Sequence, residues 1–116
     1  MRIRQVVIDS NDPRPLAEFW SFATGRDVTG DADPYLTLED RDGGDVKLLI
    51  QRVDDEINSG KNPVHVDLFT SDPEAEADRL VGKGATLVET HREGHTVIVL
   101  DDPQGNVFCV IESAAP

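Results

Sequence analysis

A histidine in a strand-like segment is the first residue with chemical potential. Residues 63–73 read PVHVDLFTSDP, and His65 stands at an alternating position of that apolar run. An isolated strand histidine is ordinary, but an earlier segment, IRQVVIDSNDP at 3–13, has the same pattern and ends in the same Asp-Pro pair. The two segments are offset by 60 residues, so His65 corresponds to Gln5.

The end of each half repeats as well. LEDRDGGDVKLLIQ (38–51) parallels LDDPQGNVFCVIE (100–112), which sets Gln51 against Glu112. Side chains alternate across a strand, so these four polar groups are expected on one side of their strands. An imidazole and a carboxylate are acid–base groups and metal ligands. His65 and Glu112 are therefore the candidate catalytic pair.

The elements that must position these groups also occur twice. Each Asp-Pro opens a helical stretch that runs to a glycine, Gly25 in the first half and Gly84 in the second, with Asp as N-cap and Pro at the first helical position. A strand is expected after each helix, near Asp27 and Thr86, and the Gly-containing turns predict a hairpin after that. The prediction is an α+β fold of two βαβββ modules in one domain, with module 1 at about 1–53, a linker at about 54–62 and module 2 at about 63–116.

The alternation predicts two different faces. The helix-covered face is expected to collect only apolar residues, among them Cys109, which would be buried and inert. The other face is half apolar, which is typical of the lining of a cleft. Its predicted ligand-binding residues are Gln5, Val7, Lys47, Leu49, Gln51, Asp67, Phe69 and Phe108. Tyr35 is a candidate for the rim, while His91 and His95 are expected in an exposed turn and strand.

Composition excludes several partners. The 116 residues carry a net charge of −12, which disfavours nucleic acid and anionic membrane surfaces. No apolar run is long enough for a membrane span, and the start of the sequence has no signal-peptide pattern. One cysteine excludes an intrachain disulfide and favours a cytoplasmic location.

The repeat, the AEFWSFATG helix, the KNPVHVDL strand, GATLV and DDPQGNVFCVIE together resemble the vicinal oxygen chelate superfamily, which contains glyoxalases, bleomycin-resistance proteins and extradiol dioxygenases. The resemblance covers the whole chain. It implies a curved sheet around a cleft with helices on the convex face, a homodimer, and a divalent metal (Zn, Ni, Mn or Fe) in the metalloenzymes. The metal positions implied are Gln5, Gln51, His65 and Glu112, of which Gln51 departs from the family's carboxylate.

Three functions follow as hypotheses. The weak ligand at Gln51 favours a glyoxalase-like protein that binds a small molecule, without a metal, in the cleft between its two modules. The alternative is a divalent-metal-dependent lyase, isomerase or dioxygenase, with His65, Glu112 and Gln5 on the metal. A metal-free enzyme with His65 as general base is the third.

Overall fold

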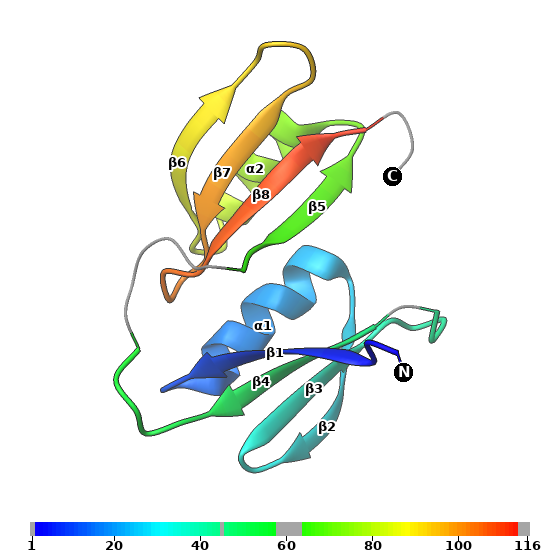
Figure 1. Ribbon diagram of the computed structural model, residues 1–116, viewed down its shortest axis with the longest axis vertical. Coiled ribbons are helices and arrows are strands. Elements are labelled where there is room, and N and C mark those ends of the chain that lie inside the picture. The colour runs from blue at the N-terminus through cyan, green and yellow to red at the C-terminus, as the bar shows by residue number, and fades with distance from the viewer. Residues whose placement is uncertain (1, 45, 58–63, 114–116) are drawn as a thin grey trace. The chain divides into compact units, whose positions relative to one another are not determined.

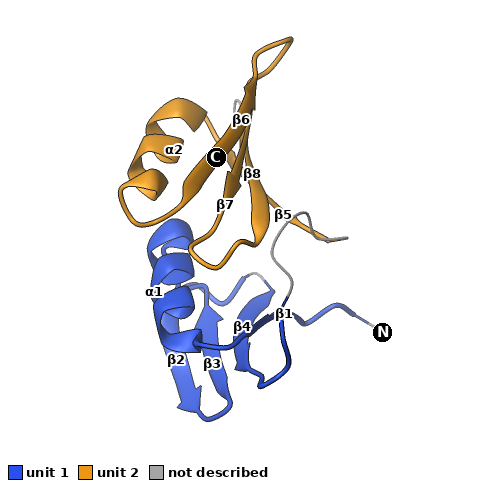
Figure 2. Ribbon diagram, turned by 90° about the vertical axis from the view of Figure 1, so that its left-hand side faces the viewer, with its two compact units in different colours: residues 1–58 blue, residues 59–116 orange. Residues whose placement is uncertain are grey.

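The computed structural model describes residues 2–44, 46–57 and 64–113, which belong to two compact units (Figure 2). Residues 1–58 form the first unit and residues 59–116 the second. Of the predicted linker, residues 58–62 lie outside the described residues. Neither helix in the described ranges is long and apolar enough to cross a lipid bilayer.

Both units have the element order strand, helix and three strands (Figure 1). The predicted α+β fold of two βαβββ modules is confirmed. The first unit contains β1 (Gln5–Ser10), α1 (Pro13–Thr24), β2 (Asp27–Ala32), β3 (Tyr35–Glu39) and β4 (Lys47–Arg52). The second contains β5 (Val66–Thr70), α2 (Pro73–Val81), β6 (Thr86–His91), β7 (Val97–Asp101) and β8 (Val107–Glu112).

Each unit forms one mixed four-stranded sheet. The strand orders are β1-β4-β3-β2 and β5-β8-β7-β6, with the first and last strand of each unit paired in parallel. Strands β2 and β6, which stand at corresponding edges of the two sheets, each carry an irregularity at a matching place, between Val28 and Gly30 and between Leu87 and Glu89. The helix of each unit lies against one face of its own sheet, so the opposite face is left open within the unit (Figures 1 and 2).

Amphipathic helices and alternating strands build the two cores. In α1 the side chains of Leu16, Phe19 and Trp20 are buried, and the two aromatic rings meet edge to face at 5.4 Å. They cover Leu36, Leu38 and Ile50 of the first sheet. In the second unit α2 buries Ala77 and Leu80, and the sheet contributes Ile98, Leu100, Phe108 and Val110. Each fully buried Leu or Phe contributes about 1.5–3 kcal/mol.

The ends of the two helices differ in detail. Asp72 caps α2 as predicted, because its carboxylate accepts from the Ala75 backbone N–H at 3.2 Å. Asp12 precedes α1 without a capping bond from its side chain, and its own backbone N–H donates to Ser10 Oγ instead. Helix α1 ends at Gly25, whose φ of 72° only glycine adopts easily. Helix α2 ends at Val81, earlier than the predicted Gly84, which lies in the following turn.

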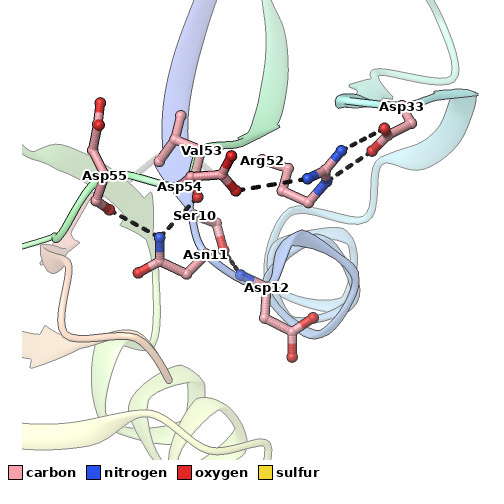
Figure 3. A network of polar contacts seen from close by, with 8 residues as sticks. All are labelled: Ser10, Asn11, Asp12, Asp33, Arg52, Val53, Asp54 and Asp55. Atoms are coloured by element: carbon pink, nitrogen blue, oxygen red, sulfur yellow. Dashed lines mark hydrogen bonds and ion pairs between the residues drawn. The ribbon is translucent and has the colours of Figure 1, made fainter.

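A polar network fixes the ends of β1 and β4 in the first unit (Figure 3). The Asn11 side-chain amide donates to the carbonyls of Val53 and Asp55, at 2.8 and 3.0 Å. Arg52 makes two hydrogen bonds to the carboxylate of Asp33, one of them from Nε at 2.9 Å. These contacts tie the β1–α1 loop and the β2–β3 turn to the end of β4.

The pairing of β1 with β4 and of β5 with β8 corrects one predicted match between residues of the two halves. Val6 pairs with Leu48 and Val66 with Phe108, so a constant offset of 60 relates both strands of each pair. Gln51 therefore corresponds to Ile111, and Glu112 corresponds to Arg52. The prediction was wrong by one residue because the last hairpin is shorter than assumed. Leu38 pairs with Leu48, ten positions on, whereas Leu100 pairs with Phe108, eight positions on.

Candidate functional site

The open face of the second sheet carries a hollow of about 370 Å³. This volume is within the range of small-molecule sites. Residues from just before β5 and from β6, β7 and β8 line it: His65, Val88, Glu89, Val99, Asp101, Val107 and Cys109. All of these residues belong to the second unit. We call this hollow the β5–β8 pocket.

Three side chains with different donor atoms meet at the edge of the pocket, and two of them, His65 and Cys109, line it. His65 precedes β5, Asp67 lies two residues further on, and Cys109 pairs directly with Asp67 across the parallel strands. His65 Nε2 lies 3.3 Å from Asp67 Oδ1. A histidine nitrogen, an aspartate oxygen and Cys109 Sγ all lie within 4.8 Å of one another. We call these residues the His–Asp–Cys cluster.

The remaining pocket walls are apolar on one part and acidic on another. Val88, Val99 and Val107 supply hydrocarbon surface, and Val88 is 53% exposed. Glu89 and Asp101 add two carboxylates, and Glu89 Oε1 also lies 3.1 Å from His91 Nε2. The pocket therefore suits a molecule with an apolar body that is neutral or positively charged.

The predicted residues of the first half share one face, as the sequence indicated. In the β1–β4 register Gln5 pairs with Lys47, Val7 with Leu49, and Asp9 with Gln51. These pairs alternate with Val6–Leu48 and Ile8–Ile50, and Ile50 is fully buried. The five predicted residues thus line the open face of the first sheet, within the first unit, and Asp9 lies beside them.

Tyr35, the predicted rim residue, lies at the start of β3 and is 42% exposed. It lines a smaller hollow of about 230 Å³ in the first unit. Arg14 and Asp31, which form an ion pair, line the same hollow. Tyr35 is therefore at the edge of a concave surface in its own unit.

The register correction changes the face of the sheet on which residues of the last strand lie. A one-residue shift moves every side chain to the other face of a strand. Phe108 is fully buried on the helix-covered face, and Cys109, expected there, lines the pocket instead. Glu112 is exposed at the strand end, where Oε1 accepts from the Thr96 backbone N–H at 2.9 Å.

His65 and Asp67 are thus brought together with Cys109, which the sequence pattern predicts on the opposite face. Phe69 lies on the same open face, 57% exposed, because it alternates with Val66 and Leu68. His91 and His95 are exposed, as predicted. The roles predicted for Gln5, Phe108 and Glu112 in binding or catalysis stay predictions.

Sequence reasoning missed Val107 and Cys109 of β8 and the pocket residues of β6 and β7. Leu38 pairs with Leu48 ten positions on, whereas Leu100 pairs with Phe108 only eight positions on, and the match of glycines did not reveal this difference, which moves Cys109 to the open face. Val88 and Glu89 had no such signal, since the irregularity in β6 changes the alternation there.

Each unit is a mixed sheet covered by one helix, and the open face of the second sheet holds a histidine. This arrangement defines the class of proteins that are built from two βαβββ units. The model of the glyoxalase-like domain family matches residues 5–111. The chain belongs to this family and, with it, to the vicinal oxygen chelate superfamily.

Solved structures share the fold at low sequence identity. A glyoxalase/bleomycin resistance protein/dioxygenase family enzyme from Burkholderia phytofirmans is 14% identical, with a TM-score of 0.79 over 97% of this chain and 98% of that one. The fosfomycin resistance protein FosX from Mesorhizobium loti is 12% identical, with a TM-score of 0.73 over 96% and 90%. A superfamily member from Sphaerobacter thermophilus is 16% identical, with a TM-score of 0.71 over 97% and 98%. No curated protein matches the chain.

The donor atoms of the His–Asp–Cys cluster fit a divalent metal of the kind that the superfamily uses. Imidazole nitrogen, carboxylate oxygen and thiolate sulfur are the three ligand types of protein zinc sites. Two of the three are anionic when bound, which matches the charge of a dication. Three protein ligands also leave a coordination position for a substrate or water, as in catalytic sites.

Proposed function

We propose that this protein binds a small organic molecule in the β5–β8 pocket. The observation that carries the proposal is the pocket itself, with three valines on its apolar part and a histidine–carboxylate pair beside it. A small-molecule site combines apolar contact area with a few polar groups that fix orientation. His65 and Asp67 supply the orienting groups, and Glu89 and Asp101 favour a neutral or cationic ligand over an anion.

His65 contributes a hydrogen-bonding ring that is already oriented. Its Nε2 faces Asp67, so the carboxylate fixes the ring position and leaves the other nitrogen for a ligand. Both side chains are about 40% exposed, with relative accessibilities of 42% and 41%, so a ligand can reach them. The same pair could hold a proton donor or acceptor against a bound molecule.

A matched pair of substitutions tests the pocket. Val107 of β8 occupies the position that Lys47 holds in β4. Leu48 pairs with Val6 and Phe108 pairs with Val66, so Leu48 and Phe108 are equivalent, and Lys47 and Val107 each stand one residue before them. The fold thus accepts lysine at this position. Val107→Lys places a long charged side chain in the pocket, and Lys47→Val removes the lysine from the first sheet.

The experiment is a ligand-observed NMR screen of neutral and cationic aromatic and aliphatic fragments, in buffer with EDTA. We expect hits for the wild-type protein to lose about 10-fold or more in affinity in Val107→Lys, because the pocket volume is filled. Lys47→Val should bind them as the wild type does. Equal loss in both variants would refute the proposal, as would amide shifts confined to the first unit when the hits are added to isotope-labelled protein.

A divalent-metal-dependent lyase, isomerase or dioxygenase is the second candidate. The observation that favours it is the His–Asp–Cys cluster at the wall of the same pocket. A bound metal would supply Lewis-acid polarisation of substrate oxygens. The chain's own contribution would be to orient the substrate against the valines and to move a proton through Glu89 or Asp101, which line the pocket.

Turnover of hemithioacetals and catechols tests this candidate, with protein loaded with Zn, Ni, Mn or Fe and with protein kept in EDTA. Activity that needs metal and is lost in His65→Gln would support it. Activity that is equal with EDTA, or equal in His65→Gln, would exclude it. The homodimer and the cytoplasmic location stay predictions, and sedimentation analysis tests the first of them.

A further inference from the structure

We infer that the second unit contains a complete thiolate-containing metal site formed by His65, Asp67 and Cys109. The inference deepens the second candidate function, since it concerns the metal of that same pocket. It differs from the set implied by the family resemblance, which draws Gln5 from the first unit and Glu112 from the strand end. The structure gathers a set in which a cysteine is a ligand and no residue of the first unit is needed.

The register of the parallel strands produces this set. Asp67 and Cys109 are direct partners in the β5–β8 pairing, so their side chains leave the sheet side by side on the open face. His65 lies two positions before Asp67 and therefore points to the same side. Neighbouring strands are about 4.8 Å apart, which places donors on adjacent strands within reach of one ion.

The distances suit a metal after small side-chain rotations. Zinc ligands at about 2.0–2.3 Å in a tetrahedral arrangement lie about 3.5 Å from one another. The cluster donors already lie within 4.8 Å, and the His65–Asp67 contact is 3.3 Å. The exposed histidine and aspartate side chains are free of the helix-covered core, so rotation of either leaves the packing of Phe108 and Val110 unchanged.

Charge distinguishes this set from the alternative one. His65, Asp67 and Cys109 bring two negative charges to a dication, whereas Gln5, His65 and Glu112 bring one. Glu89 and Asp101 add to the negative potential around the pocket. Glu112, in contrast, already accepts a backbone hydrogen bond from Thr96. Thiolate is a soft ligand, so the site should select Zn²⁺ or Co²⁺ over Mg²⁺, Ca²⁺ and Mn²⁺.

Cobalt binding to the full chain tests the inference without any assay of activity. Protein freed of metal with EDTA and returned to EDTA-free buffer is titrated with Co²⁺ and then with Zn²⁺. We expect one equivalent of Co²⁺, a near-ultraviolet sulfur-to-cobalt charge-transfer band, and loss of that band when Zn²⁺ displaces cobalt. Mg²⁺ at the same concentration should leave the band unchanged.

Four variants assign the ligands. Cys109→Ser should remove the band and weaken Zn²⁺ binding about 100-fold or more, and Asp67→Asn should weaken it by about 10-fold or more. Cys109→Asp keeps an anionic ligand, so it should retain zinc while losing the band. Glu112→Gln is the matched control, since it removes a carboxylate of the same strand outside the cluster, and its affinity should stay within about 3-fold of wild type.

Two results would overturn the inference. One is zinc binding that is equally strong in Cys109→Ser and in the wild type, with both folded by circular dichroism. The other is a larger loss in Glu112→Gln than in Cys109→Ser. Neither result affects the fragment screen, which is run in EDTA, so failure of the metal site and failure of the binding pocket are distinguishable.

Discussion

The two units share a backbone but differ in what they present on their open faces. In the first unit the central cross-strand pair is Val7 with Leu49, two apolar side chains. In the second unit the same position holds Asp67 with Cys109. One step earlier, Gln5 and Lys47 stand where His65 and Val107 do in the other unit. The repeat therefore gives both sheets equivalent backbone positions. The side chains at two or three of these positions decide whether an open face carries atoms that can bind a metal.

The difference extends to the turn before the last strand. In the second unit Asp102 is 2% exposed, and its carboxylate accepts hydrogen bonds from the backbone N–H groups of Gln104 and Asn106. In the first unit Asp40 is half-buried and accepts a long contact of 3.4 Å from the Asp42 N–H. The tighter turn is also the shorter one, and it sets the register that brings Cys109 to the pocket.

The largest expected effect on stability comes from substitutions that compare the two faces of β8. Phe108→Ala should lower the free energy of unfolding by about 3–5 kcal/mol, because it opens a cavity under α2. Cys109→Ala should change it by about 1 kcal/mol or less, because its side chain lies on the open face. Urea unfolding of both variants checks this. A reversed order would restore the face assignment first predicted from the sequence.

The sequence predicted the order of helices and strands better than it predicted which side chains of β8 lie on the open face. Alternation and the Asp-Pro starts were sufficient for both βαβββ modules, because each depends on local patterns. Matching Gly43 with Gly105 placed β8 one residue out of register, because glycines mark a turn without fixing its length. In a strand whose residues are nearly all apolar, such as VFCVI, alternation gives no signal that would have exposed the error.

The site depended on that register and was therefore predicted only in part. His65 and Asp67 were assigned to the open face because VHVDLF alternates clearly. Cys109 was assigned to the wrong face, and a buried thiol was the natural reading of a cysteine between Phe and Val. Val99 and Asp101 come from β7, a strand that the sequence predicts without indicating which of its side chains face the helix.

The turn provides the second prediction. Asp102→Ala should destabilise the protein by about 2–3 kcal/mol, because it leaves half-buried N–H groups of the turn without their acceptor. Asp40→Ala should cost about 0.5 kcal/mol, since the equivalent carboxylate is more exposed and makes a longer contact. Thermal unfolding of the two variants measures the difference. Equal effects would show that the two turns contribute alike, against the contrast in their hydrogen bonding.

The smallest expected effect is a loss of stability at acid pH, and it comes from two ion pairs of the first unit. The hydrogen bonds from Arg52 lower the pKa of Asp33 below its ordinary 3.8, and those from Arg41 do the same for Asp27. Because the folded pKa is lowered, each pair stabilises the protein fully above the unfolded value, and the contribution is lost as the pH falls through the folded pKa. Both pairs are exposed, so the change in stability is small and is reduced further by salt.

Carboxyl NMR titration separates this effect from general acid unfolding. The pKa of Asp33 should lie below 3.8 in the wild type and rise towards it in Arg52→Gln, while the pKa of Asp27 stays lowered because its partner is Arg41. The reciprocal change, Arg41→Gln, should move Asp27 alone. If either substitution moved both carboxyls, the two ion pairs would be coupled through the β2–β3 hairpin that carries both aspartates, and the first unit would titrate as one network.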